Sequence, residues 1–149
     1  MKHQVAGVAI DISSSVRRLS VSRALVRKAA IATLHSEKVK DAMLSITFVG
    51  RAAMSRLNKR YLGHHGATDV ISFGLERVGS RGAVIGDVYI CAEVARENAK
   101  RQGVSAGQEL LRLVIHGTLH VLGHDHPEGG GRATSPMWRK QEKILARVL

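Results

Sequence analysis

One segment constrains this chain more than any other: residues 116–126 read His-Gly-Thr-Leu-His-Val-Leu-Gly-His-Asp-His. His116 and His120 lie four residues apart in an apolar run, so on a helix they project from one face, about 40° apart. Gly123 offers a place for that helix to end and for the chain to turn back. His126, beyond the turn, can then return toward the first two imidazoles. The segment therefore predicts a helix and a turn that bring three imidazoles together.

Three convergent neutral imidazoles suit zinc, iron or nickel, and zinc is the commonest of these in proteins. Three protein ligands leave one coordination position for water, which is typical of a hydrolytic centre. A second interpretation is a closed structural zinc site in which His124 or Asp125 is the fourth ligand. Such sites are usually rich in cysteine, and this chain has a single one, Cys91. The segment thus indicates a metal site of the open, catalytic kind.

Composition limits the class of protein and of partner. A chain of 149 residues is long enough for one domain with a core and too short to expect two. The formal net charge of +11 favours a polyanionic partner such as RNA, while an aromatic content of only 3% argues against a base-stacking platform. Cys91 cannot form an internal disulfide, which fits a reducing cytoplasm. No apolar run approaches membrane-spanning length, so we expect no membrane partner.

Hydrophobic periodicity predicts an alternation of strands and helices. We expect strands at residues 4–12, 42–49, 69–73 and 84–91, with serines 13–15 ending the first. The third and fourth strands fit a hairpin with a long loop. Helices are expected at 22–35, 51–62, 92–102 and 136–147, and Ser105 is expected to cap the helix that carries the histidines. The buried face of the first helix is predicted to contain Ala24, Leu25, Ala29, Ile31 and Leu34.

With these segments in order, the chain resembles the YbeY family of bacterial endoribonucleases and ribosomal RNA maturation factors. The resemblance spans roughly residues 57–145 and also includes the order of elements in the first third. Besides the triple-histidine segment, it rests on four motifs: Leu57-Asn58 with Tyr61, Thr68-Asp69-Val70-Ile71-Ser72-Phe73, Ile85-Gly86-Asp87-Val88-Tyr89-Ile90, and Met137-Trp138 with Gln141 and Glu142.

The resemblance implies an α+β fold in which a mixed four-stranded β-sheet packs with about five helices. Residues 1–149 would form a single YbeY-like metal-dependent hydrolase domain with a metzincin-like triple-His site beside a basic cleft. The resemblance also implies one Zn²⁺ per chain, held by His116, His120 and His126, and we assign His116 a catalytic role as well. The implied function is single-strand-specific endoribonuclease activity in the 3′-end maturation of small-subunit (16S) ribosomal RNA and in ribosome quality control. RNA and the ribosome would be the partners, in the cytoplasm.

One position departs from the family pattern. Many members carry an arginine directly after the tyrosine that matches Tyr61, and that arginine is thought to contact RNA, but this chain has Leu62 there. Arg60, two residues before Leu62, cannot be assumed to replace it. As RNA-contacting residues we predict Arg51, Lys59 and Arg60.

Two other functions fit parts of the sequence. The histidine spacing is also that of metzincin proteases, in which a glutamate follows the first histidine and acts as general base. Gly117 occupies that position here, and nothing in the sequence places Asp125 or Glu128 on the metal-bound water. The other alternative is a non-catalytic assembly factor that grips ribosomal RNA with its basic surface and uses the metal for stability.

Overall fold

The computed structural model describes residues 7–75, 82–125 and 135–149. Over these ranges it contains four strands and five α-helices, which confirms the predicted α+β class. In chain order they are β1 (Val8–Ser14), α1 (Arg23–Ser36), β2 (Ala42–Val49), α2 (Arg51–Leu57), the π-helical turn η1 (Asn58–Leu62), β3 (Val70–Leu75), β4 (Val84–Cys91), α3 (Ala92–Gln102), α4 (Ala106–Val121) and α5 (Pro136–Val148).

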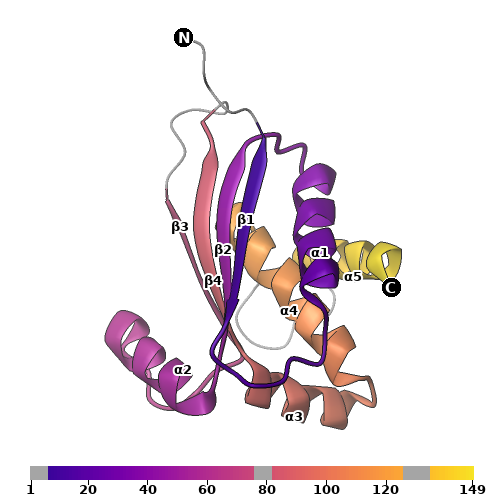
Figure 1. Ribbon diagram of the computed structural model, residues 1–149. Coiled ribbons are helices and arrows are strands. Elements are labelled where there is room, and N and C mark those ends of the chain that lie inside the picture. Colours follow the sequence, from indigo (N-terminus) through magenta and orange to yellow (C-terminus); the bar gives the residue numbers. More distant parts are fainter. Residues whose placement is uncertain (1–6, 76–81, 126–134) are drawn as a thin grey trace.

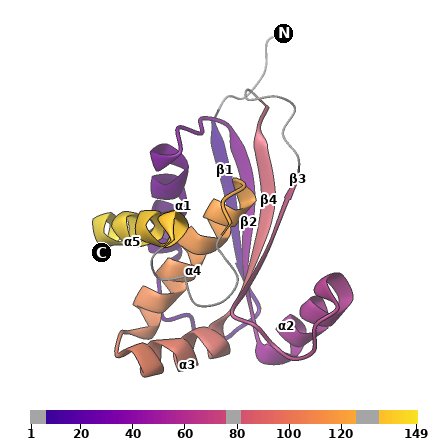
Figure 2. The same cartoon turned by 180° about the vertical axis from the view of Figure 1, so that it is seen from behind.

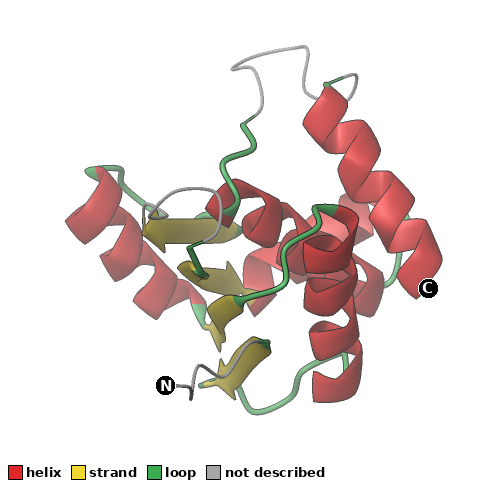
Figure 3. Cartoon of the chain, turned by 90° about the horizontal axis from the view of Figure 1, so that it is seen from above, coloured by secondary structure: helices red, strands yellow, loops and turns green. Residues whose placement is uncertain are grey.

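The strands form one mixed sheet in the order β1-β2-β4-β3. β1, β2 and β4 run parallel, whereas β3 pairs antiparallel with β4, as the predicted hairpin requires. Helices α1, α3, α4 and α5 gather on one face of the sheet, and α2 lies on the other side near one end (Figures 1 and 2). Viewed from above, most helices lie together on one side of the strands (Figure 3).

Helix α4 is the centre of this helical layer. It contacts β3 and β4 beneath it and packs against α1, α3 and α5 around it. Every residue from Glu109 to Leu119 is buried. The core consists of large side chains from the sheet and the helices, among them Phe48, Ile46, Ile90, Leu34, Ile115, Leu119 and Ile144. Burial of each such side chain stabilises the fold by roughly 1.5–3 kcal/mol, and the helix that carries the histidines lies within this core.

Two details of the first third differ from the sequence prediction. β1 continues through Ser13 and Ser14, because both residues pair with β2 in parallel register. Helix α1 buries Val26, Ala29, Ala30, Thr33 and Leu34, whereas Leu25 is 38% exposed. The predicted face is therefore wrong in part. Apolar residues occur at so many positions of this helix that periodicity alone does not define its buried side.

Smaller boundary shifts occur elsewhere. β3 begins one residue later and ends two residues later than predicted, and the helix predicted at 51–62 changes to π-helical geometry at Asn58. β2, β4 and α3 have the predicted bounds. Gly103, at φ 69°, ends α3 as predicted. None of the helices within the described ranges is both long and apolar enough to span a bilayer.

Candidate metal centre

Both ends of helix α4 are fixed by local hydrogen bonds. The Ser105 side chain accepts a hydrogen bond from the backbone N–H of Gln108 at 3.1 Å, as expected of an N-cap. At the other end, Gly123 has φ 98°, a conformation that favours glycine. Its N–H donates to the His120 carbonyl at 2.9 Å, and the N–H of His124 donates to the Leu119 carbonyl at 3.0 Å, which completes a Schellman motif. The predicted helix and turn are confirmed.

His116 and His120 face each other from successive turns of α4. Their Nε2 atoms lie 3.1 Å apart, and their ring planes cross at 73°. Two imidazole nitrogens bound to one tetrahedral zinc at 2.0–2.1 Å would be about 3.3 Å apart, so the pair fits two ligands of a single cation. His116 is only 5% exposed, while His120 is partly exposed. The pair thus lies where the protein interior meets a surface cavity.

The third predicted ligand, His126, lies outside the described residues, as does Glu128. Within residues 7–75, 82–125 and 135–149, no three histidine, cysteine or acidic side chains are grouped so that they could hold a metal. His124, considered above as a fourth ligand, instead forms a hydrogen bond with the Glu37 carboxylate at the end of α1. Lys140 contacts the same carboxylate at 2.7 Å. These contacts anchor the turn after α4 and hold the His124 side chain on Glu37, away from the histidine pair.

Beside the histidine pair is a cavity of about 300 Å³. His116 and His120 form one wall, and residues 68–72 at the start of β3 form another. Leu62 also lines this cavity and is 48% exposed. The position at which this chain departs from the family arginine therefore faces the candidate metal ligands. Arg60 does not line this cavity, so it does not take the place of that arginine here.

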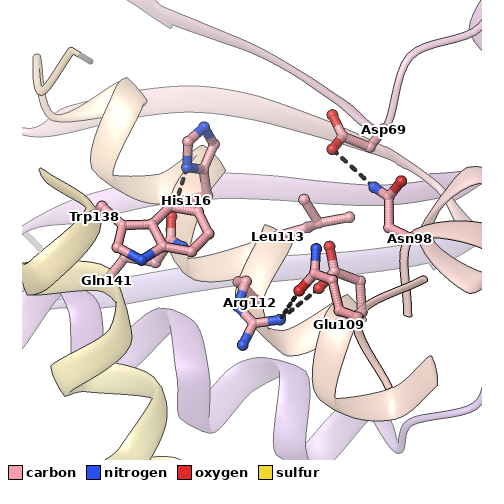
Figure 4. Close-up of a pocket in the computed structure, with 9 residues that line it drawn as sticks. Asp69, Asn98, Glu109, Arg112, Leu113, His116, Trp138 and Gln141 are labelled. Atoms are coloured by element: carbon pink, nitrogen blue, oxygen red, sulfur yellow. Dashed lines mark hydrogen bonds and ion pairs between the residues drawn. The ribbon is translucent and has the colours of Figure 1, made fainter. Parts of the chain in front are cut away.

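His116 and Asp69 also line a second cavity, of about 280 Å³ (Figure 4). Its lining is largely polar. Figure 4 shows Trp138, Gln141 and His116 at one side, Asp69 and Asn98 at the opposite side, and Arg112 with Glu109 between them. Asp69 accepts a hydrogen bond from the Asn98 amide at 3.2 Å, which joins the start of β3 to α3.

A continuous polar chain runs behind His116. The Nδ1 atom of His116 lies 2.6 Å from Oε1 of Gln141, and the Gln141 amide donates to Glu142 at 2.9 Å. Arg112 binds both carboxylate oxygens of Glu142, at 2.9 and 3.0 Å, and binds Glu109 at 2.6 Å. These hydrogen bonds therefore link α4 to α5, from His116 to a buried ion pair.

The charged groups behind His116 change one another's pKa values. Burial alone would raise the pKa of Glu142, but hydrogen bonds from Arg112 and Gln141 outweigh it, and the pKa lies below the ordinary value for glutamate. For Glu109, burial is the stronger effect and raises the pKa despite the ion pair with Arg112. The hydrogen bonds from Arg112, first of all to Glu142, raise the pKa of the guanidinium further. Glu142 thus carries its negative charge at neutral pH.

Gly117 faces the sheet and not the cavity. A Cβ atom at this position would lie 2.5 Å from a methyl group of Val88 and 3.3 Å from one of Val70. No side chain fits there without movement of the helix or the sheet. The position at which a metzincin protease carries its glutamate base is therefore occupied in this fold by a close contact between helix and sheet.

The three predicted RNA-contacting residues do not lie together. Lys59 and Arg60 line a groove on α2 and η1 with Arg56 and the half-exposed ring of Tyr61. The Arg60 guanidinium lies 5.5 Å from the centre of the Tyr61 ring. Arg51, in contrast, forms ion pairs with Glu93 and Glu97 of α3, which compensate its charge. Arg56 is the basic residue of this groove that the sequence prediction missed.

Residues 10–149 match the sequence profile of the family described as Endoribonuclease YbeY. The chain belongs to the YbeY endoribonuclease family. This confirms the resemblance inferred from the motifs and, with it, the predicted enzyme class of nuclease hydrolase.

Relatives named Endoribonuclease YbeY extend over most of the chain. The protein from Beutenbergia cavernae is 47% identical over 116 residues, which are 73% of this chain and 76% of that protein. The Geobacter sulfurreducens protein is 33% identical over 141 residues, covering 92% of this chain and 93% of its own length. The solution structure of a Thermotoga maritima protein superposes with a TM-score of 0.63 at 27% identity and covers 93% of this chain and 88% of that one.

The residues that sequence reasoning did not assign to the site are those behind His116. Gln141 and Glu142 enter the sequence prediction only as part of a YbeY motif, and Arg112 belongs to none of the motifs. One signal was available: Gln141 shares the buried face of α5 with Met137, Ile144 and Leu145. A polar residue among apolar ones on such a face needs a buried partner.

Proposed function

We propose that this chain is a zinc-dependent, single-strand-specific endoribonuclease. The observation that carries the proposal is the 3.1 Å approach of the His116 and His120 Nε2 atoms at the wall of a cavity, in a chain of the YbeY family. His126 is proposed as the third ligand, which leaves one position for solvent or substrate. Bound there, zinc would act as a Lewis acid toward a phosphoryl oxygen and lower the pKa of a bound water.

Residues of this chain would bind the metal, orient its ligands and hold the RNA. His116 and His120 present their Nε2 atoms, and the polar chain through Gln141 holds the His116 ring. Residues 68–72 and Leu62 line the cavity that a single strand of RNA would enter to reach the histidine pair. Arg56, Lys59 and Arg60 on the neighbouring groove would hold phosphates of the strand outside the cavity, with the Tyr61 ring among them.

The net charge of +11 supports RNA over a peptide as substrate. The close contact at Gly117 further weighs against proteolysis, because it leaves no room for the glutamate base of a metzincin. As the natural substrate we propose the 3′ region of small-subunit ribosomal RNA. The proposed place of action is the assembling ribosome in the cytoplasm.

The test compares zinc content and RNA cleavage across matched variants. His116→Ala, His120→Ala and His126→Ala are purified alongside wild type, a mock preparation and His65→Ala, a control at an exposed loop histidine. We expect wild type and His65→Ala to hold about one zinc per chain and to cleave a single-stranded RNA. The three site variants should lose zinc and fall to the mock background. Full metal-dependent cleavage by these variants would rule out the proposed site.

The ribosomal role needs a separate experiment in cells. Bacteria that lack the enzyme would be complemented with wild type or with His120→Ala, and the 3′ ends of their small-subunit RNA mapped. The proposal requires that only wild type restores the mature ends. Restoration by His120→Ala would instead support the non-catalytic assembly factor considered from the sequence.

A further inference from the structure

We propose that Gln141, oriented by Glu142, is a positioning residue that holds His116 as the Nδ1-protonated tautomer and so keeps its Nε2 atom available as a ligand. This inference rests on the proposed function for its purpose, but the tautomer itself is a property of the chain without metal. Gln141 is 1% exposed and His116 is 5% exposed, so water does not compete for their contact.

The argument begins at Arg112, whose side chain is 9% exposed. Its guanidinium places Nε and one terminal nitrogen on the two oxygens of Glu142, at 2.9 and 3.0 Å. This two-point contact fixes the carboxylate in position and favours its charged form. A charged carboxylate can only accept hydrogen bonds.

The next step concerns the amide of Gln141. One end of the amide lies 2.9 Å from Oε2 of Glu142 and must be the NH₂ group, because two acceptors would repel each other. The other end is therefore the oxygen, and it lies 2.6 Å from Nδ1 of His116. An amide that could otherwise be turned by 180° is thus held in one orientation by the charge of Glu142.

The last step concerns the imidazole. Since the Gln141 oxygen is an acceptor, Nδ1 of His116 must carry the proton, and in the neutral ring Nε2 then has a lone pair. That lone pair points to the Nε2 atom of His120 at 3.1 Å, where a shared cation would lie. A partner on the remaining ring nitrogen typically improves metal affinity by 10–100-fold.

Burying the charged groups of Arg112 and Glu109 costs free energy, and a gain in stability does not explain why the protein does so. Arg112 and Glu109 are buried charges, and a buried ion pair seldom stabilises a fold more than apolar residues of the same size would. Here the pair also keeps Arg112 in place, with a further contact to Gln102 at 3.2 Å. The free energy spent on these buried charges fits a requirement that the His116 ring be held in one orientation.

The experiment uses the full chain and two readouts besides activity. The first is the ¹⁵N NMR signature of the His116 ring in metal-free protein, which distinguishes the two neutral tautomers. The second is zinc affinity measured by competition with a chelator. Gln141→Met removes the acceptor and keeps the volume, and Thr33→Val removes a buried hydrogen bond in α1 as a matched control for stability.

We expect wild type and Thr33→Val to show the Nδ1-protonated form. Gln141→Met should show a mixture of tautomers and bind zinc 10–100-fold more weakly. If Gln141→Met does not fold, Glu142→Gln tests the same chain and should also give a mixture. The inference is overturned if wild-type His116 is protonated on Nε2, or if the variant that folds keeps both the wild-type tautomer and the wild-type zinc affinity.

The design also separates this inference from the proposed function. Loss of the single tautomer in Gln141→Met supports the positioning role whether or not His116→Ala binds zinc. Normal zinc binding by His116→Ala would count only against the proposed metal site.

Discussion

The two sides of the candidate site differ in how they hold their charged groups. Behind His116, the buried Arg112 contacts the buried Glu109 and the partly exposed Glu142 at distances of 2.6–3.0 Å. On the α2 side, Lys59 and Arg60 are exposed, and Arg51 is paired with acidic side chains that are about half exposed. The buried side is suited to fixing one geometry, and the exposed side to binding a flexible polyanion of varied sequence.

The largest predicted effect lies on the buried side. Arg112→Met leaves Glu109 and Glu142 without their partner and should lower the free energy of unfolding by about 3–5 kcal/mol. Arg51→Ala breaks two ion pairs at the exposed side and should cost less than about 1 kcal/mol. Urea denaturation of both variants measures the difference. Similar losses for the two would show that the contrast between the sides is wrong.

A smaller loss is expected where the buried side meets the sheet. In Gly117→Ala the new methyl group would lie 2.5 Å from Val88, which over-packs the core and should cost about 1–3 kcal/mol, less what alanine gains in helix propensity. Gly117→Ala with Val88→Ala should recover part of the loss, since the second change removes the methyl groups in conflict. Equal stability of Gly117→Ala and wild type in thermal unfolding would contradict the close contact.

On the exposed side the predictions concern RNA and not stability. Lys59→Ala with Arg60→Ala should weaken binding to a single-stranded RNA and reduce the slope of log affinity against log salt by about 0.7 for each lost phosphate contact. Arg51→Ala should change the slope less, because the acidic residues of α3 already compensate its charge. Fluorescence anisotropy over a salt series provides the measurement. A larger effect from Arg51→Ala would reassign the RNA surface.

Leu62→Arg restores the family arginine at the wall of the histidine cavity. We expect tighter RNA binding and a steeper salt dependence, because a cation would then face the proposed phosphate position. Leu62→Met, which adds no charge, is the matched control. If Leu62→Arg and Leu62→Met bind RNA equally well, this chain does not need a cation at that position.

The smallest effect concerns the anchor of the turn after α4. Burial would raise the pKa of Glu37, but the contacts with Lys140 and His124 outweigh it and lower the pKa. A lowered pKa means that the stabilising contribution is present above the ordinary value of about 4.3 and is lost as the pH falls through the lower value in the folded protein. The stability difference between wild type and Glu37→Gln should therefore be constant well above a pH of about 4.3 and shrink as the pH falls below that value. A difference that stays constant would show that the charge of Glu37 is not what matters.

The sequence predicted the parts of the fold that depend on local signals. The bounds of β2, β4 and α3 follow from alternation and from Gly103, and the end of α4 follows from Gly123. The face of α1 did not follow, because the choice between Leu25 and Val26 is made by packing against α4 and α5.

The site divides in the same way. The spacing of His116 and His120 on one helix was enough to predict that their side chains meet. The contact of His116 with Gln141 spans 25 residues and depends on how α5 crosses α4, which no local pattern encodes. The position of Leu62 beside the histidine pair likewise depends on tertiary packing and not on a local sequence pattern. His126, outside the described residues, stays a prediction.

The most direct test of the account is anomalous diffraction at the zinc edge from crystals grown with zinc. One strong peak is predicted, about 2.0–2.1 Å from the Nε2 atoms of His116 and His120, with His126 as the third protein ligand. A peak that lies elsewhere, or no peak between these two rings in protein saturated with zinc, would contradict it.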